Sequence, residues 1–245
     1  MDSAQREERC RIGVVLGSSR PGRRGAAVAG WVTEVAAGHP SVRSGATVVD
    51  VIDLAEQQLP MLDEPVPALF GDYRNAHTRR WSALVAGYDA FVFVTPEYNA
   101  SVPAVLKNAV DYLYAQWQGR PAGVVSYGLR GGVEAGDHLR QILAEVRTVP
   151  VATRVELSVL TDFDFSDEDR DDPTAQGRIA PDPERAEALT AMLAEIVAAV
   201  AERRTEPDQT GVAGQADQAG QAGQADQTGV AGQVVPAVVG DAAGG

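Results

Sequence analysis

A buried strand followed by a turn and an amphipathic helix constrains the fold of this chain more than any other stretch. Residues 91–95, Phe-Val-Phe-Val-Thr, show no polar alternation, which is typical of a strand covered on both faces of a parallel sheet. Pro96 ends the run because proline cannot donate to a strand ladder. Apolar residues then recur at helical spacing, which predicts a helix with Ser101 as its N-cap and Pro103 in its first turn. Residues 96–100 therefore form a turn at the carboxyl end of a central strand, where open α/β sheets bind ligands.

Short apolar runs and helical patterns alternate along the rest of the chain. Further strands are predicted at 12–16, 47–52, 123–126 and 149–157, and helices at 26–37, 73–87, 133–147 and from Pro183 onward. Five strands alternating with helices predict a parallel sheet with helices on both faces, and right-handed crossovers restrict its topology. The connection from Asp53 to Gly71 is long and irregular, as functional connections often are.

Composition limits the partners and the compartment. The 245 residues carry a formal net charge of −13, which argues against a nucleic-acid partner because such a partner calls for a basic face. The single cysteine, Cys10, excludes an internal disulfide, fits a reducing compartment and should be inert. No apolar run reaches membrane-spanning length and the first nine residues lack the apolar core of a signal peptide, so we expect a soluble, cytoplasmic protein with no membrane partner.

A change of composition near Arg204 marks the expected domain boundary. Residues 1–9 are polar, residues 10–204 carry the predicted strands and helices, and residues 205–245 are dominated by Gly, Ala and Gln with a nine-residue repeat. The double-glycine pattern of a calcium-binding β-roll is absent from this repeat. We therefore predict a flexible N-terminus, one folded domain, and a disordered low-complexity tail that cannot bury enough apolar area to offset its ordering entropy.

The loop after the first strand is a candidate anion site. Residues 17–25, Gly-Ser-Ser-Arg-Pro-Gly-Arg-Arg-Gly, lead into a helix, so their amides and the helix N-terminus favour an anion. The loop lacks the Lys and Ser/Thr of a Walker motif, and it lacks the dinucleotide fingerprint GxGxxG. The hydroxyls of Ser18 and Ser19 and the guanidinium of Arg20 suit a terminal phosphate monoester.

Two motifs together give the chain a resemblance to a known family. The turn Thr-Pro-Glu-Tyr-Asn with the following Leu-Lys-Asn helix, over residues 95–113, and the loop Gly-Ser-Ser-Arg-Pro-Gly resemble the NADPH-dependent FMN reductase family of flavodoxin-like proteins. The resemblance covers residues from about Arg11 to Arg204. It implies an α/β fold, a flavodoxin-like three-layer sandwich whose five-stranded parallel sheet has the order 2-1-3-4-5. The loops after strands one, three and four would then surround one crevice.

The resemblance also implies where FMN binds. In the family the corresponding Ser and Arg of the first loop hold the FMN phosphate, which we carry to Ser18 and Arg20. The Pro-Glu-Tyr-Asn loop and the glycine-containing loop after strand four contact the isoalloxazine ring, and glycines let the main chain approach it closely. The residues expected at the ring are Pro96, Glu97, Tyr98, Asn99, Ser126, Gly128, Gly131 and Gly132. For Gly131 and Gly132 a packing or turn role stays open beside the ligand role.

The implied function is that of an FMN-dependent NAD(P)H oxidoreductase. Hydride passes from NADPH or NADH to the flavin N5, and electrons pass on to a small acceptor such as a quinone, free flavin, an azo compound or an oxidised metal. Because the flavin carries the chemistry, we expect no catalytic side chain and no metal site. The resemblance further implies a homodimer or homotetramer. Two alternatives stay open: a flavodoxin-type electron carrier, against which Arg20 counts, and a non-catalytic flavin-binding sensor or interaction module.

Other polar residues are expected to be structural or solvated. The three histidines lack metal-ligand spacing and should face solvent; they are His39, His77 and His138. Of Arg23 and Arg24, at least one should be a solvated surface charge. The acidic stretch 161–172 lacks the Gly and the Glu that an EF-hand loop requires, so we expect a solvated acidic loop.

Overall fold

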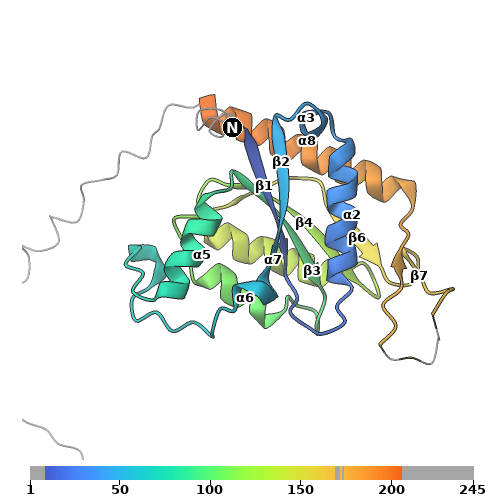
Figure 1. Cartoon of the computed structure of the whole chain (residues 1–245), viewed down its shortest axis with the longest axis horizontal. Helices are drawn as coiled ribbons and strands as arrows, with labels where there is room; N and C mark the ends of the chain where they lie inside the picture. Colours follow the sequence, from blue (N-terminus) through green and yellow to red (C-terminus); the bar gives the residue numbers. More distant parts are fainter. Residues whose placement is uncertain (1–8, 169–171, 173, 206–245) are drawn as a thin grey trace, which may run out of the picture. The chain divides into compact units, whose positions relative to one another are not determined.

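A parallel sheet forms the middle of the structure, a computed structural model that describes residues 9–168, 172 and 174–205 (Figure 1). The strands are β1 (Cys10–Leu16), β2 (Thr47–Asp53), β3 (Ala90–Pro96), β4 (Pro121–Gly128), β5 (Val149–Pro150) and β6 (Val155–Ser158). Their order is β2-β1-β3-β4-β5, with β6 also paired to β4, and every pair is parallel. The predicted order 2-1-3-4-5 is confirmed.

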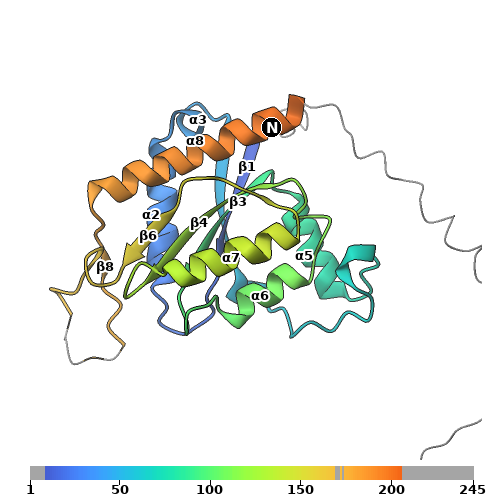
Figure 2. The ribbon, with the colours of Figure 1, turned by 180° about the vertical axis from the view of Figure 1, so that it is seen from behind.

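Helices cover both faces of this sheet. One face carries α2 (Gly25–Gly38) and α8 (Pro183–Thr205); the other carries α5 (Ala76–Ala86), α6 (Ala104–Asp111) and α7 (Val133–Glu145). Figure 2 shows α6 and α7 in front of the strands. Side chains of β3 alternate between the two cores: Val92 and Val94 pack with α2 and α8, whereas Phe91 and Phe93 pack with the other three helices. All four are fully buried, which confirms a strand covered on both faces.

Shorter elements lie in the connections. They are α3 (Pro40–Arg43), α4 (Leu54–Gln57), the 3₁₀ turn η1 (Ala68–Phe70), and the antiparallel pair β7 (Phe163–Asp164) and β8 (Arg178–Ile179). The long connection between β2 and α5 is held against α6 by the Asn of the Leu-Lys-Asn motif. Asn108 accepts from the Leu62 amide (2.9 Å) and donates to the Pro60 carbonyl (2.7 Å). This motif residue therefore has a structural role.

The strand predicted over 149–157 is wrong as a single element, because it is divided into β5 and β6. Pro150 has no amide to donate, and a competing acceptor lies on α8. The Thr153 amide donates to the Glu195 carboxylate (3.0 Å), and the Thr153 hydroxyl bonds to the same group. Pairing with β4 resumes only at Val155. A side chain from a helix thus replaces the strand ladder for a few residues.

Two predicted helix starts are also wrong. The helix predicted from Tyr73 begins at Ala76. In α6, Pro103 occupies the N-cap position with φ −59° and ψ 144°, and the helix begins at Ala104. Proline disfavours helical backbone in the residue before it, so Ser101 lies too early to cap the helix and pairs with Tyr98 instead.

Both ends of the chain lie outside the described residues. The predictions of a flexible N-terminus and of a disordered tail fall almost entirely on residues 1–8 and 206–245, which the structure does not describe. In the part that it does describe, no helix combines the length and the apolar character needed to cross a bilayer.

Candidate functional site

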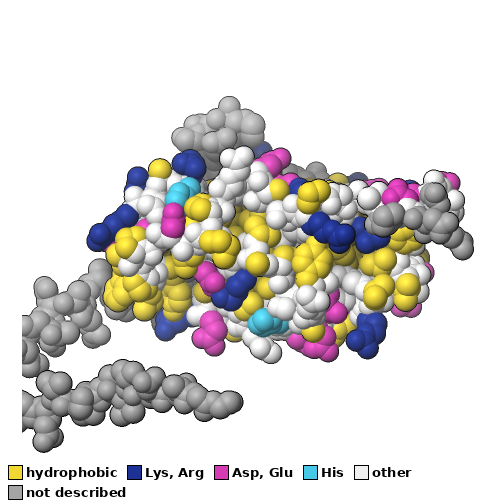
Figure 3. All heavy atoms as spheres, turned by 90° about the horizontal axis from the view of Figure 1, so that it is seen from below, with side chains coloured by type: hydrophobic (Ala, Val, Ile, Leu, Met, Phe, Trp, Pro, Cys, Tyr) yellow, Lys and Arg dark blue, Asp and Glu magenta, His cyan; other side chains and the backbone are white. Residues whose placement is uncertain are grey.

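Three loops meet at the carboxyl edge of the sheet, after β1, β3 and β4. Backbone hydrogen bonds join them: the Gly17 amide donates to the Val94 carbonyl (2.9 Å), and the Glu97 amide donates to the Tyr127 carbonyl (2.9 Å). The chain leaves β1 for α2 on one face and leaves β3 for α6 on the other face, so this is the topological switch point of the sheet. Figure 3 views the molecule from this side, where hydrophobic side chains spread over much of the surface with Lys and Arg among them.

The loop after β1 presents donors for an anion. A Cβ at Gly17 would lie 2.8 Å from the Val94 carbonyl oxygen, so glycine is required for the close approach of this loop to β3. Ser18 is fully buried, whereas Ser19 and Arg20 are exposed. Within the described residues, the amides of Ser18 and Ser19 donate to no acceptor. Unpaired amides beside a hydroxyl and a guanidinium are the donor set that a phosphate requires.

The expectation of a solvated Arg23 or Arg24 is wrong, because both side chains fix the loop to other elements. Arg23 forms an ion pair with Asp53 at the end of β2, and both side chains are mostly buried. Arg24 donates to the carbonyl oxygens of Gln176 (2.7 Å) and Ala175 (2.8 Å). A guanidinium carries five donors and can therefore bridge distant segments. These contacts leave Arg20 as the exposed arginine of the loop.

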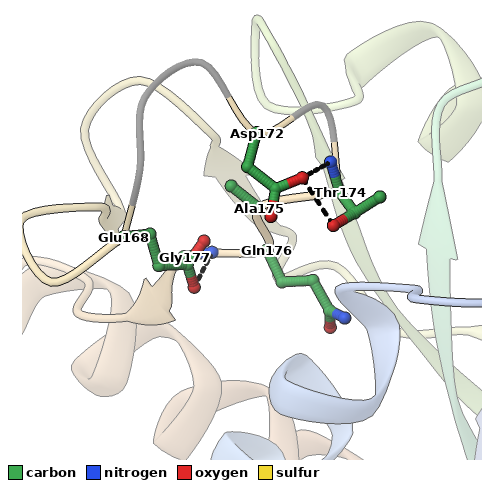
Figure 4. A pocket seen from close by; sticks show the side chains of 6 residues that line it. All are labelled: Glu168, Asp172, Thr174, Ala175, Gln176 and Gly177. Atoms are coloured by element: carbon green, nitrogen blue, oxygen red, sulfur yellow. Dashed lines mark hydrogen bonds between the residues drawn. The ribbon is translucent and has the colours of Figure 1, made fainter.

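The segment that receives Arg24 borders a polar pocket. The pocket is lined by Glu168, Asp172, Thr174, Ala175, Gln176 and Gly177 (Figure 4). Asp172 Oδ1 accepts from the amide and the hydroxyl of Thr174, each at 2.7 Å. The side-chain nitrogen Nε2 of Gln176 lies 3.4 Å from the position that a Cβ would take at Gly22. Residues 174–177 therefore pack on the loop after β1 and support it.

The Pro-Glu-Tyr-Asn loop forms a strained two-residue turn. Tyr98 and Ser101 exchange backbone hydrogen bonds (2.9 and 3.1 Å), and the two residues between them have positive φ, 52° at Asn99 and 61° at Ala100. This is the pattern of a type I′ turn. The left-handed conformation costs an alanine about 1–2 kcal/mol. Such strain persists where the surroundings enforce it, often at functional sites.

A side-chain hydrogen bond joins this turn to the loop after β1. The Tyr98 hydroxyl lies 3.1 Å from Ser18 Oγ, and the Tyr98 side chain stays 36% exposed. Two residues predicted for the same site thus meet, although 80 positions separate them in sequence. Because part of the Tyr98 side chain stays exposed, its ring can offer apolar surface to a ligand.

Two predicted ring residues direct their side chains into the protein. Glu97 Oε2 accepts from the backbone amides of Glu134 (3.1 Å) and Ala135 (3.3 Å), in the first turn of α7. Ser126 is buried, and its hydroxyl donates to the Gly131 carbonyl (2.8 Å). Both side chains therefore hold loops in place.

The glycines after β4 are required by the turn. Gly131 and Gly132 have φ values of 81° and 70°, and a Cβ at Gly132 would lie 2.8 Å from the Tyr127 backbone nitrogen. A Cβ at Gly128 would lie 3.2 Å from the Gly132 nitrogen. The structure thus shows the turn role that the sequence left open, and the ligand role of these glycines stays a prediction.

The histidines and the cysteine lie mostly in structural settings. Of the three histidines, only His138 is exposed as predicted, and its ring bonds to Ser101 Oγ (2.7 Å). His39 and His77 are half-buried and bond to Ser41 (2.8 Å) and Asp63 (2.9 Å), so their predicted exposure is wrong. Burial raises the pKa of the Cys10 thiol to about 11, and Cys10 begins β1 at the end away from the crevice. A neutral buried thiol agrees with the prediction of an inert cysteine.

The fold and the site define a flavodoxin-like α/β protein with a loop rich in hydrogen-bond donors, residues 17–25, at the switch point of its sheet. A family model described as NADPH-dependent FMN reductase matches residues 10–162. An NAD(P)H-dependent FMN reductase from Nectria sp is 40% identical over 146 residues, which are 58% of this chain and 71% of that protein. A quinone reductase from Pseudomonas putida is 34% identical over 139 residues, 54% of this chain and 68% of that protein.

The solved structures agree with the fold. A flavoenzyme NAD(P)H:(acceptor) oxidoreductase from Paracoccus denitrificans superposes with a TM-score of 0.56 at 22% identity, covering 79% of this chain and 98% of that one. The chain belongs to the NADPH-dependent FMN reductase family and is an oxidoreductase. The cofactor of this family is FMN, and NAD(P)H is its electron donor.

Proposed function

We propose that the chain binds FMN at this crevice and passes electrons from NAD(P)H to a small acceptor, with quinones as the leading class. The observation that carries the proposal is the donor set of the loop after β1. In the described part of the chain, the Arg20 guanidinium makes no hydrogen bond or ion pair, and the amides of Ser18 and Ser19 are unpaired. The Ser18 hydroxyl is fully buried and shares a hydrogen bond with Tyr98, so it would reach a phosphate only after the Tyr98 side chain moves. These groups would hold the FMN phosphate.

Backbone groups of the other two loops would hold the ring. The segments 96–99 and 128–132 lie at the ends of neighbouring strands β3 and β4. Glu97 and Ser126 would contribute by fixing these loops, and Tyr98 by its exposed aromatic surface. When bound, FMN supplies the redox chemistry, taking hydride from the nicotinamide and giving electrons to the acceptor. The chain's own residues bind, orient and partly enclose the ring.

Apolar side chains beside the crevice support a planar, apolar acceptor. Leu129 in the loop after β4 and Leu160 in the loop after β6 are 68% and 73% exposed. Ser158 connects these loops, because its hydroxyl donates to the Leu129 carbonyl (3.1 Å) and accepts from the Leu160 amide (3.2 Å). The name of the Pseudomonas relative points to the same class. Free flavin, azo compounds and oxidised metals are the acceptors to compare with quinones.

Purified protein tests the proposal in two steps. Flavin released on denaturation should be FMN, and the protein should oxidise NADPH or NADH continuously when a quinone is present. A protein that retains FMN but oxidises neither nicotinamide would be a flavodoxin-type carrier or a sensor. Parallel assays with free flavin, an azo dye and a ferric complex would rank the acceptors, and a quinone rate below all three would overturn the quinone assignment.

We also propose that the protein is a cytoplasmic homodimer or homotetramer. The connection between β2 and α5 exposes four large apolar side chains, Met61, Leu62, Leu69 and Phe70, by between 47% and 73%. Apolar side chains gathered in this way are typical of a subunit contact. Light scattering on the full chain would give the mass, and a monomer at micromolar concentration would contradict the proposal.

A further inference from the structure

Helix α7 receives its N-terminal cap from a distant loop. Its own N-cap residue is Gly132, at φ 70° and ψ 30°, which makes no side-chain cap hydrogen bond. The cap comes from Glu97, whose Oε2 accepts from the amides of Glu134 (3.1 Å) and Ala135 (3.3 Å). The first amides of a helix lack intrahelical partners and carry partial positive charge, so a side-chain oxygen that accepts from them stabilises the start of the helix.

The same hydrogen bonds connect the loop after β3 to the start of α7, on the two sides of the crevice. Glu97 follows β3, and α7 begins directly after the glycine loop that follows β4. The Glu97 backbone amide also donates to the Tyr127 carbonyl of β4 (2.9 Å). At the other end of the turn, Ser101 Oγ bonds to His138 Nδ1 of α7 (2.7 Å). The loop after β3 is therefore attached to α7 on both sides of its strained turn.

We infer that Glu97 is a positioning residue that sets the spacing between the two loops that hold the flavin ring. Its carboxylate is engaged by α7, so it acts on the ring through the loops and not by contact. This inference rests on the proposed FMN site. It extends that site by assigning the Glu of the Pro-Glu-Tyr-Asn motif to the capping of α7. Loss of the contact should loosen both loops and weaken binding of the ring.

Three substitutions at one position separate hydrogen bonding from charge. A single oxygen, Oε2, accepts both amides, so the carbonyl oxygen of Glu97→Gln can keep both bonds without the charge. Glu97→Asp keeps the charge but retracts the carboxylate by one methylene, and Glu97→Ala removes the group. A matched control is Glu64→Ala. Glu64 accepts from the amides of Arg74 (3.0 Å) and Asn75 (2.9 Å) just before α5, outside the three loops after β1, β3 and β4.

Flavin titration gives the first readout. Ala and Asp at position 97 should weaken FMN binding by about 10-fold, equivalent to about 1.4 kcal/mol. Riboflavin should lose the same factor, because the effect is on the ring and not on the phosphate. The Gln variant should stay within about 2-fold of wild type, and Glu64→Ala should lower the melting temperature without changing flavin affinity. Equal flavin losses in the Glu97→Ala and Glu64→Ala variants, or a Gln variant as weak as the Ala variant, would overturn the inference.

Hydrogen exchange of the flavin-free protein tests the connection between Glu97 and α7 without relying on the flavin. Amides in 98–101 and 129–135 should exchange faster in the Ala and Asp variants than in wild type, and at near-wild-type rates in the Gln variant. Unchanged exchange in the Ala and Asp variants would overturn the role of Glu97 even if FMN binds. A wild type that binds no flavin would defeat the proposed function, and this measurement would still decide the positioning role.

Discussion

Replacement of Arg20 by alanine should weaken FMN binding without harming the fold. The Arg20 side chain is exposed, and no hydrogen bond or ion pair attaches it to the described part of the protein. Its removal therefore breaks no hydrogen bond or ion pair among the described residues. Its neighbours Arg23 and Arg24, by contrast, hold the loop to Asp53 and to 175–176, so their replacement would disturb the loop itself. This difference makes Arg20 the arginine that tests phosphate binding.

The size of the effect follows from the exposure of the side chain. A hydrogen bond to a charged group contributes about 1.5–3 kcal/mol, or about 10- to 150-fold in affinity. Because Arg20 is exposed, water and salt screen its charge. We therefore expect a loss near 10-fold at physiological ionic strength, and a larger loss at low salt. Turnover at saturating FMN should stay near wild type, since the phosphate is remote from the reacting end of the flavin.

Titration of FMN and riboflavin into flavin-free protein measures the effect directly. Riboflavin lacks the phosphate, so its affinity should hardly change in the Arg20→Ala variant. Arg43→Ala is the matched control, because Arg43 is an exposed arginine on α3, at the opposite end of the sheet (Figure 1). Equal losses for FMN and riboflavin, or an equal FMN loss in the Arg43 variant, would refute the assignment of Arg20 to the phosphate.

Three further predictions concern stability. Ala100→Gly should raise the free energy of unfolding by about 0.5–1 kcal/mol in chemical denaturation, because it relieves the left-handed strain at φ 61° and this gain exceeds the added entropy of the unfolded chain; a decrease would show that the turn is not strained. Burial raises the Cys10 pKa from 9.0 to about 11, so folded protein keeps a proton that the unfolded chain releases, and stability should fall between about pH 9 and 11. Cys10→Ala should remove that part of the loss, and an identical pH profile would contradict it. Deletion of residues 207–245 should leave the melting temperature and flavin content unchanged, and a clear drop in either would show that these residues contribute to the domain.

The order of the elements was available from the sequence, and so was the meeting of two of the candidate loops. Apolar runs without alternation predict strands buried on both faces, and 91–95 does form such a strand in β3. Polar turns at the carboxyl ends of parallel strands lie at one edge of the sheet, and the contact between Ser18 and Tyr98 shows that two of them meet. These inferences succeed because hydrophobic periodicity and turn chemistry act over a few neighbouring residues.

Which side chains remain available to a ligand was decided only by the tertiary structure. Arg20, Arg23 and Arg24 share one loop, yet Arg24 finds its partner about 152 positions away and Arg20 has none among the described residues. Glu97 belongs to the recognised motif, but its cap on α7 spans 37 positions and leaves no local signal. The break after β5 likewise depends on Glu195 of α8. Hydrogen bonds of this kind form between groups that only folding brings within about 3 Å, so residue type and spacing along the chain cannot reveal them.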